Sequence, residues 1–162
     1  ALRAKRLTAQ HMRAMLVEFC EAHGPEQIEA SYGWGQGQPR GMVASERSWE
    51  FRVAGARVGW GSVILNTADD ADDEAVLVVG VFPEHQRRGY RAQILEWLCA
   101  EATRLGAEVA SMIVRKANAA HYNRTMREAH AEGSPWVYAG DVWYPEPAAH
   151  GIFVRHLGPD KP

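Results

Sequence analysis

The first 41 residues alternate between a strand-like run, two helix-like runs and a loop. Residues 2–7 predict a first strand, and Thr8 is placed to cap the helix that follows it. That helix carries an apolar stripe at helical spacing and ends before Gly24-Pro25. Residues 25–30 predict a second short helix. The glycine-rich segment 31–41 predicts an irregular loop.

The remainder of the chain continues with short strands and two amphipathic helices. Two strand-like runs, 48–54 and 57–65, are joined by a predicted hairpin turn at Gly55-Ala56. The later elements follow in this order: an acidic loop at 68–74, a buried strand at 75–82, a helix from about Arg88 to Leu105 with Gly106 as its C-terminal cap, a strand at 109–114, a helix at 118–130, and strands at 136–144 and 151–157. The order β-α-α-β-β-β-α-β-α-β-β fits neither a doubly wound sheet nor a simple α+β sandwich.

Composition narrows the class of protein. A chain of 162 residues with 46% apolar and 23% charged residues predicts one globular domain, 1–162. The net charge of −2 argues against nucleic acid or an anionic membrane surface as partner, and no run approaches the roughly 20 apolar residues of a membrane span. The N-terminal residues lack an apolar signal core, and we expect Cys20 and Cys99, on helix-like segments, to be buried thiols instead of a disulfide. We therefore expect a cytoplasmic protein without a metal.

The segment VVGVFPEHQRRGYRAQIL (78–95) carries the strongest functional signal. An apolar strand ends at Pro83, a polar turn containing Gly89 follows, and an amphipathic helix begins. Such a turn directs several backbone N–H groups and a helix N-terminus at one point, which suits a phosphate. The alternative is an ordinary helix start with exposed arginines. Arginines at a helix N-terminus oppose the helix dipole, so Arg87 and Arg88 favour a bound anion.

The element order, together with the pattern V-x-V-x-P-x-x-Q-R-R-G at 79–89, resembles the GNAT superfamily of acyl-CoA-dependent N-acyltransferases. The resemblance spans nearly the whole chain in element order and is sharp over 76–118. The family's phosphate loop reads Gln/Arg-x-x-Gly-x-Gly/Ala, and this chain departs from it with Arg91 at the last position. The resemblance implies a mixed α/β fold: a mostly antiparallel seven-stranded sheet with splayed parallel fourth and fifth strands and flanking helices.

The resemblance also implies a cofactor, acetyl-CoA, which serves as the acyl donor. Its pantetheine arm would fill the gap between the splayed strands, where unpaired backbone groups are costly. An amide N–H near Val81 would face the thioester oxygen and stabilise the oxyanion. The implied cofactor-binding residues are Val79, Gly80 and Val81 for the arm, Gln86, Arg87, Arg88, Gly89, Tyr90, Arg91 and Ala92 for the pyrophosphate, and Asn118 for a further contact with the arm.

The general acid implied by the resemblance is a tyrosine seven residues after Asn118, and Thr125 occupies that position here. Tyr122 lies about one helical turn nearer the N-terminus, on the same face, and is the candidate acid. Tyr122 has a competing interpretation as core packing, and Asn118 one as a simple N-cap. The sequence leaves open whether Tyr122 or Thr125 serves as the general acid.

The general base is less well marked. Some members that acetylate protein N-termini carry a glutamate five residues before the asparagine, where this chain has Ile113, so that subtype loses support. Glu74 at the start of the fourth strand is our candidate, because an amine must lose its proton before it attacks. It competes with an interpretation as part of a solvated loop. His121 and His130 are further candidates.

The predicted function is N-acetyl transfer to a primary amine by direct attack on the thioester. The acceptor is a small-molecule or protein amine, and Tyr32 and Trp34 in the glycine-rich loop suggest a partly aromatic acceptor pocket. A homodimer through the closing strands is a further expectation. The alternative is a GNAT-fold module that binds cofactor or partner without turnover, to which Thr125 and Arg91 lend support. Action on nucleic acid has little support, because no basic-aromatic stripe occurs.

Overall fold

The computed structural model describes residues 1–33, 47–65, 73–142 and 149–158. The elements, in chain order, are β1 (Leu2–Leu7), α1 (Ala9–His23), α2 (Pro25–Tyr32), β2 (Ser48–Val53), β3 (Ala56–Leu65), β4 (Glu74–Val81), the short 3₁₀ helix η3 (Pro83–His85), α3 (Tyr90–Arg104), β5 (Val109–Arg115), α4 (Ala119–Ala129), β6 (Val137–Val142) and β7 (His150–His156). This order confirms the order predicted from the sequence.

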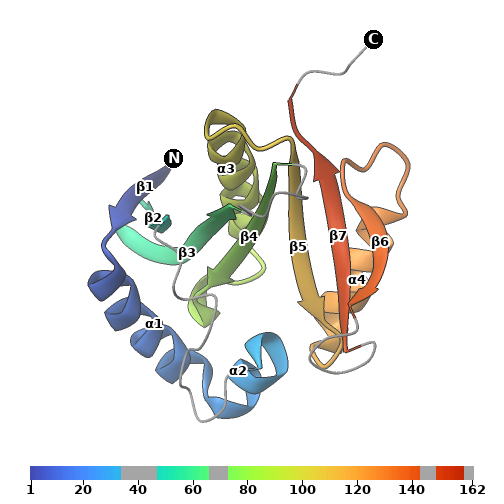
Figure 1. Ribbon diagram of the computed structural model, residues 1–162. Coiled ribbons are helices and arrows are strands. Elements are labelled where there is room, and N and C mark those ends of the chain that lie inside the picture. Colours follow the sequence, from blue (N-terminus) through green and yellow to red (C-terminus); the bar gives the residue numbers. More distant parts are fainter. Residues whose placement is uncertain (34–46, 66–72, 143–148, 159–162) are drawn as a thin grey trace.

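The strands form a single seven-stranded sheet in the order β1-β2-β3-β4-β5-β7-β6 (Figure 1). Every neighbouring pair runs antiparallel except β4 and β5, which run parallel. A parallel pair needs a crossover connection, and α3 supplies it. The predicted mixed α/β fold with a mostly antiparallel seven-stranded sheet is therefore confirmed.

The parallel pair is joined over only three residues of each strand. Glu74, Ala75 and Val76 pair with residues 109–111, and no further pairing connects the two strands. From Val76 onward β4 stays paired with β3, and β5 stays paired with β7 along its whole length. The sheet therefore splays between β4 and β5, as Figure 1 shows.

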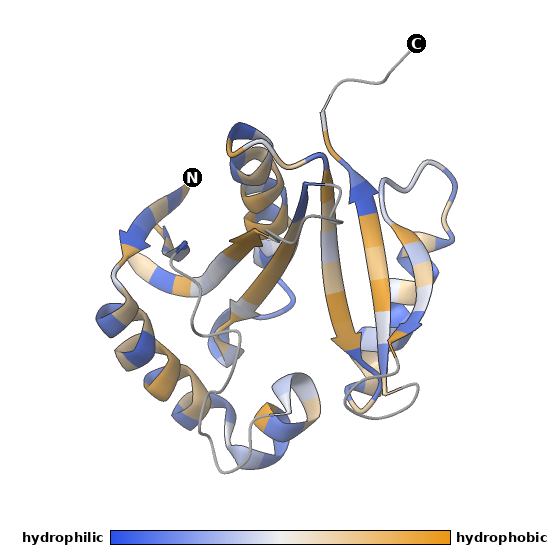
Figure 2. Cartoon of the chain, in the orientation of Figure 1, coloured by the Kyte–Doolittle hydropathy of each residue, from blue (hydrophilic) through white to orange (hydrophobic). Residues whose placement is uncertain are grey.

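Helices cover both faces of the sheet. The helix α3 packs on one face through Ile94, Leu98 and other buried residues, and Tyr122 and Met126 of α4 join the same cluster. The helix α1 packs on the opposite face, where its residues cluster with Ile28 of α2 and with Trp60. The strands in the middle of the sheet are accordingly the most continuously apolar part of the chain in Figure 2.

Gly80 in β4 is dictated by a close approach between α1 and the sheet. A Cβ atom at this position would lie 2.2 Å from Trp60 Nε1 and 2.8 Å from Phe19 Cζ. Phe19 and Trp60 pack edge to face with ring centroids 5.5 Å apart. Only glycine lets both rings reach the strand, so this residue holds α1 against the middle of β4.

Several element boundaries differ from the prediction by one or two residues, and the C-cap of α3 is Leu105 instead of Gly106. The hairpin turn between β2 and β3 lies at Ala54-Gly55, one residue earlier than predicted, and both residues have positive φ. The helix α3 begins at Tyr90, because Gly89 adopts a left-handed conformation. The helix α2 continues to Tyr32 instead of ending at residue 30. The last difference matters most, because it places Tyr32 on a helix.

No helix of the described residues is long and apolar enough to cross a membrane. Within the same residues, no group of three or more histidine, cysteine, aspartate or glutamate side chains is arranged to hold a metal ion. Cys20 and Cys99 are both buried free thiols, as predicted.

We expect Val58→Ala to lower the free energy of unfolding by about 2 kcal/mol, because it removes two buried methyl groups and leaves a cavity. Val58 is fully buried in β3, whereas Val137 in β6 is 56% exposed. The matched control, Val137→Ala, should cost below about 0.5 kcal/mol. Urea denaturation of the two variants checks this, and equal losses would contradict the assignment of the core.

Candidate active site

The turn between β4 and α3 collects unpaired backbone N–H groups. Arg87 and Gly89 adopt left-handed conformations with φ of 64° and 81°. Among the described residues, no hydrogen bond takes up the N–H groups of residues 87–92. Gln86 differs, because its N–H donates to the Pro83 carbonyl at 3.3 Å. A non-glycine residue with positive φ stores strain, and such strain is typical of functional turns.

Positive charge surrounds this turn. Arg87 and Arg88 are exposed, whereas Arg91 in the first turn of α3 is half-buried. Burial lowers the pKa of Arg91, and its electrostatic neighbours are Tyr32 of α2 together with Glu128 and Arg124 of α4. Arg91 therefore lies between elements from both faces of the sheet, at the open end of the splay.

Electrostatics at the start of α4 point to the same place. Burial, followed by the positive charges of Arg91 and Arg124, lowers the pKa of His121 to about 3. Two arginines from different helices thus act on one half-buried imidazole, so the region between the first turns of α3 and α4 is electropositive. The free N–H groups of the turn and these side chains together form a candidate anion site.

The edge of β4 that faces the splay begins at this anion site. The Phe82 N–H bonds to Val58 of β3, so alternation turns the backbone groups of Val79 and Val81 away from β3 and into the splay. By the same alternation Gly80 faces β3. Beyond the three paired residues, Val79 and Val81 therefore present N–H and C=O groups with no strand beside them.

The end of α2 reaches this open edge from the other face of the sheet. The Tyr32 hydroxyl donates to the Val79 carbonyl at 3.2 Å. The side-chain amide of Asn118 donates to the Ser31 hydroxyl at 3.0 Å. Burial raises the pKa of Tyr32, so the phenol keeps its proton. Two consecutive residues of α2 thus make these bonds: Tyr32 bonds to β4, and Ser31 bonds to the residue that precedes α4.

The Val81 carbonyl is held by the turn that follows it. The Gln86 side-chain amide donates to this carbonyl at 3.3 Å and also lies 3.1 Å from His23 Nε2. His23 contacts the Phe19 carbonyl through Nδ1 at 3.0 Å, and burial lowers its pKa. The Gln86 side chain therefore fixes the turn to α1 and β4 within the folded protein.

No family model and no curated protein matches this chain. Its fold nevertheless matches solved structures over almost its full length. The GNAT domain of S. lividans PAT has a TM-score of 0.69 and 18% identity, and the match covers 96% of this chain and 90% of that domain. The chain has the GNAT fold.

Two further solved structures with this fold carry ligands. The yncA protein from Salmonella typhimurium, solved with its cofactor acetyl-CoA, matches with a TM-score of 0.68 and 17% identity over 100% of this chain and 97% of that one. Spermidine N-acetyltransferase from Vibrio cholerae, in complex with CoA and spermine, matches with a TM-score of 0.65 and 12% identity over 96% and 95%. At these identities the comparison concerns the fold.

Several residues singled out from the sequence gather at one end of the splay. Val79 and Val81 line its β4 edge, and Asn118 lies across from them at the start of α4. The turn and first helical residues, Arg87, Arg88, Gly89, Tyr90, Arg91 and Ala92, follow directly from β4. Asn118 occupies the N-cap position of α4, but its side-chain amide donates to Ser31 and makes no capping hydrogen bond.

Tyr122 faces a different part of the protein. Its ring packs 6.4 Å from Phe153, and a Cβ atom on Gly151 would lie 2.8 Å from it, which places the ring against β7. The strand β5 separates β7 from the splay, so these contacts favour packing over proton transfer. The hydroxyl of Thr125 donates to the His121 carbonyl at 2.8 Å and is likewise committed.

The candidate general bases lie in different parts of the protein. Glu74 lies at the closed end of the splay, paired with Val109. His130 lies exposed at the end of α4, with Nδ1 2.8 Å from the Met126 carbonyl. With a pKa of about 3, His121 is a weak base at neutral pH. Trp34 and most of the acidic loop 68–74 lie outside the described residues.

Sequence reasoning missed Ser111. It is the last residue of β5 that pairs with β4, and its side chain is 1% exposed. Its hydroxyl is buried without a hydrogen-bond partner among the described residues. A serine inside the apolar run 109–114 was the available signal. It places a polar group at the point where the strands separate.

We expect acid to destabilise the protein through His121. Its pKa is near 6.5 in the unfolded chain and about 3 in the folded one, so between these values the unfolded state binds more protons. The free energy of unfolding should therefore fall as the pH drops from about 6.5 towards 3. His121→Gln should lessen this fall, and urea denaturation between pH 7 and 4 measures it.

Pyrophosphate provides the control for the anion site. A bound anion offsets the repulsion from Arg91 and Arg124, so it should raise the pKa of His121 in an NMR titration. His11, exposed on α1, serves as the internal reference. An identical His121 titration with and without pyrophosphate would contradict an anion at this place.

Proposed function

We propose that the protein is an acetyl-CoA-dependent N-acetyltransferase that moves an acetyl group to a primary amine. The observation that carries this proposal is the junction of two features: free N–H groups at residues 87–92, and the unpaired β4 edge that begins beside them. The first suits a diphosphate and the second suits an extended chain with amide groups. The neighbours solved with acetyl-CoA and with CoA and spermine support the same donor.

In this proposal the diphosphate lies on the turn, with Arg87, Arg88 and Arg91 around it. The pantetheine arm then extends along Val79 and Val81, taking the place of a missing strand. Gly80 serves by allowing α1 to pack behind this edge. Asn118 reaches the arm from the opposite side, where its amide now meets Ser31.

The chemistry is direct acyl transfer. The neutral amine nitrogen attacks the thioester carbon, a C–N bond forms, the C–S bond breaks, and the thiolate of CoA leaves and takes up a proton. The N–H of Val81 stabilises the oxyanion that forms on attack. Glu74 lies seven residues from Val81 along the strand, roughly 23 Å away, so it accepts the amine proton only through a chain of water.

The second candidate function is a module that binds cofactor without turnover. It is favoured by the contacts of Tyr122 and Thr125, which leave neither hydroxyl at the splay. The two functions share the cofactor site and differ only in acyl transfer. Release of free thiol in the presence of amines therefore separates them.

Two measurements test the proposal. Acetyl-CoA should raise the melting temperature, because a ligand that binds only the folded state stabilises it. Thiol release should then appear with a panel of primary amines. No shift at saturating acetyl-CoA would refute both functions, and a shift without thiol release on any amine would leave the binding module.

Gly89→Ala should weaken CoA binding by roughly tenfold or more. A left-handed conformation costs a non-glycine residue about 1–2 kcal/mol, and relaxation of the turn would redirect its N–H groups. Gly133→Ala is the matched control, because Gly133 also has a positive φ, of 78°, and open space at its Cβ position. Calorimetric titration with CoA compares the two, and equal affinities would misplace the phosphate site.

Tyr32→Phe should strengthen CoA binding by about two- to tenfold. The Tyr32 hydroxyl occupies the Val79 carbonyl that the arm requires, and a net hydrogen bond is worth about 0.5–1.5 kcal/mol. The control is Tyr138→Phe, which removes a hydroxyl bonded to Asp141 on β6. Weaker or unchanged affinity in Tyr32→Phe would mean that Tyr32 does not compete with the arm.

A further inference from the structure

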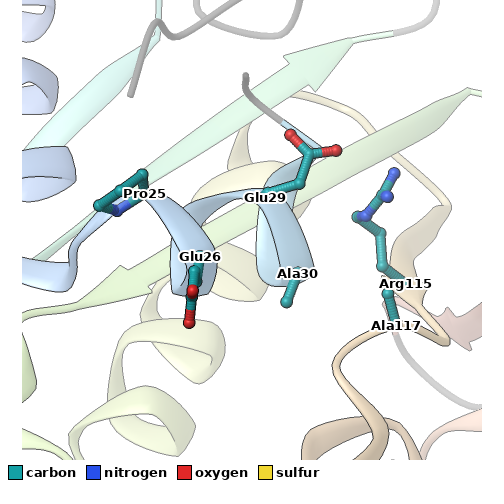
Figure 3. Close-up of a pocket in the computed structure, with 6 residues that line it drawn as sticks. All are labelled: Pro25, Glu26, Glu29, Ala30, Arg115 and Ala117. Atoms are coloured by element: carbon teal, nitrogen blue, oxygen red, sulfur yellow. The ribbon is translucent and has the colours of Figure 1, made fainter. Parts of the chain in front are cut away.

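A cavity of about 510 Å³ opens between α2 and the end of β5. Its lining residues are Pro25, Glu26, Glu29, Ala30, Arg115 and Ala117, shown in Figure 3. It is formed by the helix whose last residues contact Val79 and Asn118. The cavity therefore adjoins the splay.

The cavity carries opposite charges that do not neutralise each other. In Figure 3 the Glu29 side chain extends towards the side where Arg115 stands, whereas Glu26 points away. Within the described ranges, neither Glu29 nor Arg115 takes part in an ion pair. A carboxylate and a guanidinium thus line one cavity without meeting.

Arg115 has spare hydrogen-bonding capacity. Its Nη1 lies 3.3 Å from His150 Nε2, and its Nε is buried without a partner among the described residues. Gly33 makes room for the guanidinium, because a Cβ atom there would lie 2.6 Å from Nη1. A guanidinium presents five donors in a planar fork that matches a carboxylate, and most of this fork meets no acceptor within the part of the chain that the structure describes.

We propose that this cavity binds the acceptor, and that the acceptor is an α-amino acid. The proposal rests on the acyltransferase function proposed above. Glu29 takes the ammonium group and Arg115 takes the carboxylate through paired hydrogen bonds. A polyamine fits less well, because Arg115 would repel it and its own fork would stay unpaired.

The position of Glu29 suits the reaction. Glu29 and Tyr32 are three residues apart on α2, so their Cβ atoms are roughly 5–6 Å apart on one side of the helix. Tyr32 reaches Val79 on the open β4 edge. An amine held by Glu29 therefore lies within about one helical turn of Tyr32. Tyr32 in turn contacts the edge of β4 along which we propose that the pantetheine arm lies.

The experiment compares amino acids with the amines that lack only the carboxylate: histidine with histamine, and phenylalanine with phenethylamine. In thiol release with acetyl-CoA, at least one amino acid should exceed its decarboxylated partner at least tenfold in kcat/KM. Arg115→Gln should remove this preference, and Arg115→Lys should restore part of it. Glu29→Gln should lower kcat/KM for both members of the pair.

Controls separate charge at the cavity from charge elsewhere. Arg13→Gln and Glu21→Gln alter exposed residues of α1 and should leave the preference unchanged. Binding of the same compounds to the unacylated protein, followed by NMR shifts of the Arg115 and Glu29 amides, tests the site without acyl transfer. An amino acid should shift both amides, and its decarboxylated amine should shift them less.

The outcomes distinguish this proposal from the function on which it rests. If acetyl-CoA stabilises the protein and decarboxylated amines react as well as amino acids, the acyltransferase function stands and the amino-acid assignment is refuted. An Arg115→Gln variant with the wild-type preference, together with absent amide shifts, refutes it as well. Failure of acetyl-CoA to bind refutes the proposed function first.

Discussion

The edge of β4 that faces β5 without pairing to it is the constraint on which the rest of this structure depends. A backbone N–H or C=O without a partner costs about 1–3 kcal/mol when water cannot reach it, so an open edge within a sheet must be served by other groups. Here side chains serve the carbonyls: Tyr32 at Val79 and Gln86 at Val81. The N–H groups of the same residues have no such partner among the described residues. Among the described residues, this edge is therefore half satisfied: its carbonyls have partners and its N–H groups have none.

The turn after β4 adds positive charge to a second set of unpaired N–H groups. The left-handed conformations of Arg87 and Gly89 prevent the first N–H groups of α3 from folding back onto the chain. Arg91 then lies between α2 and α4, so the charged end of the splay is assembled from three helices. Charge and backbone donors converge because the strand, turn and helix are consecutive in sequence, whereas the residues of α2 and α4 arrive through tertiary packing.

The sequence predicted the elements and the turn because both are local. Apolar periodicity and glycine positions report on the nearest few residues, and those signals placed Gly89 and the order of strands correctly. Tyr122 is different, because its place is determined by Gly151, whose missing side chain makes room for the ring. Tyr32 and Arg115 gained their significance from contacts more than 30 residues away, at Val79 and His150. No local pattern encodes such contacts: the helical end of α2 brings Tyr32 to Val79, and the pairing of β5 with β7 places Arg115 opposite His150.

The three-residue pairing of β4 with β5 divides the sheet into two blocks, β1–β4 and β5–β7, that share a short hinge. Only three residue pairs resist a rotation of the two blocks about that hinge. The displacement of the strands that such a rotation causes grows with their distance from the hinge. The end of α2 bridges the open end of the splay. Tyr32 bonds to Val79 in the first block, whereas Ser31 and Gly33 contact Asn118 and Arg115 beside the second. Any rotation about this hinge would therefore displace the two blocks most at the open end of the splay, whereas the strands beside Ser111, where they are paired, would hardly separate.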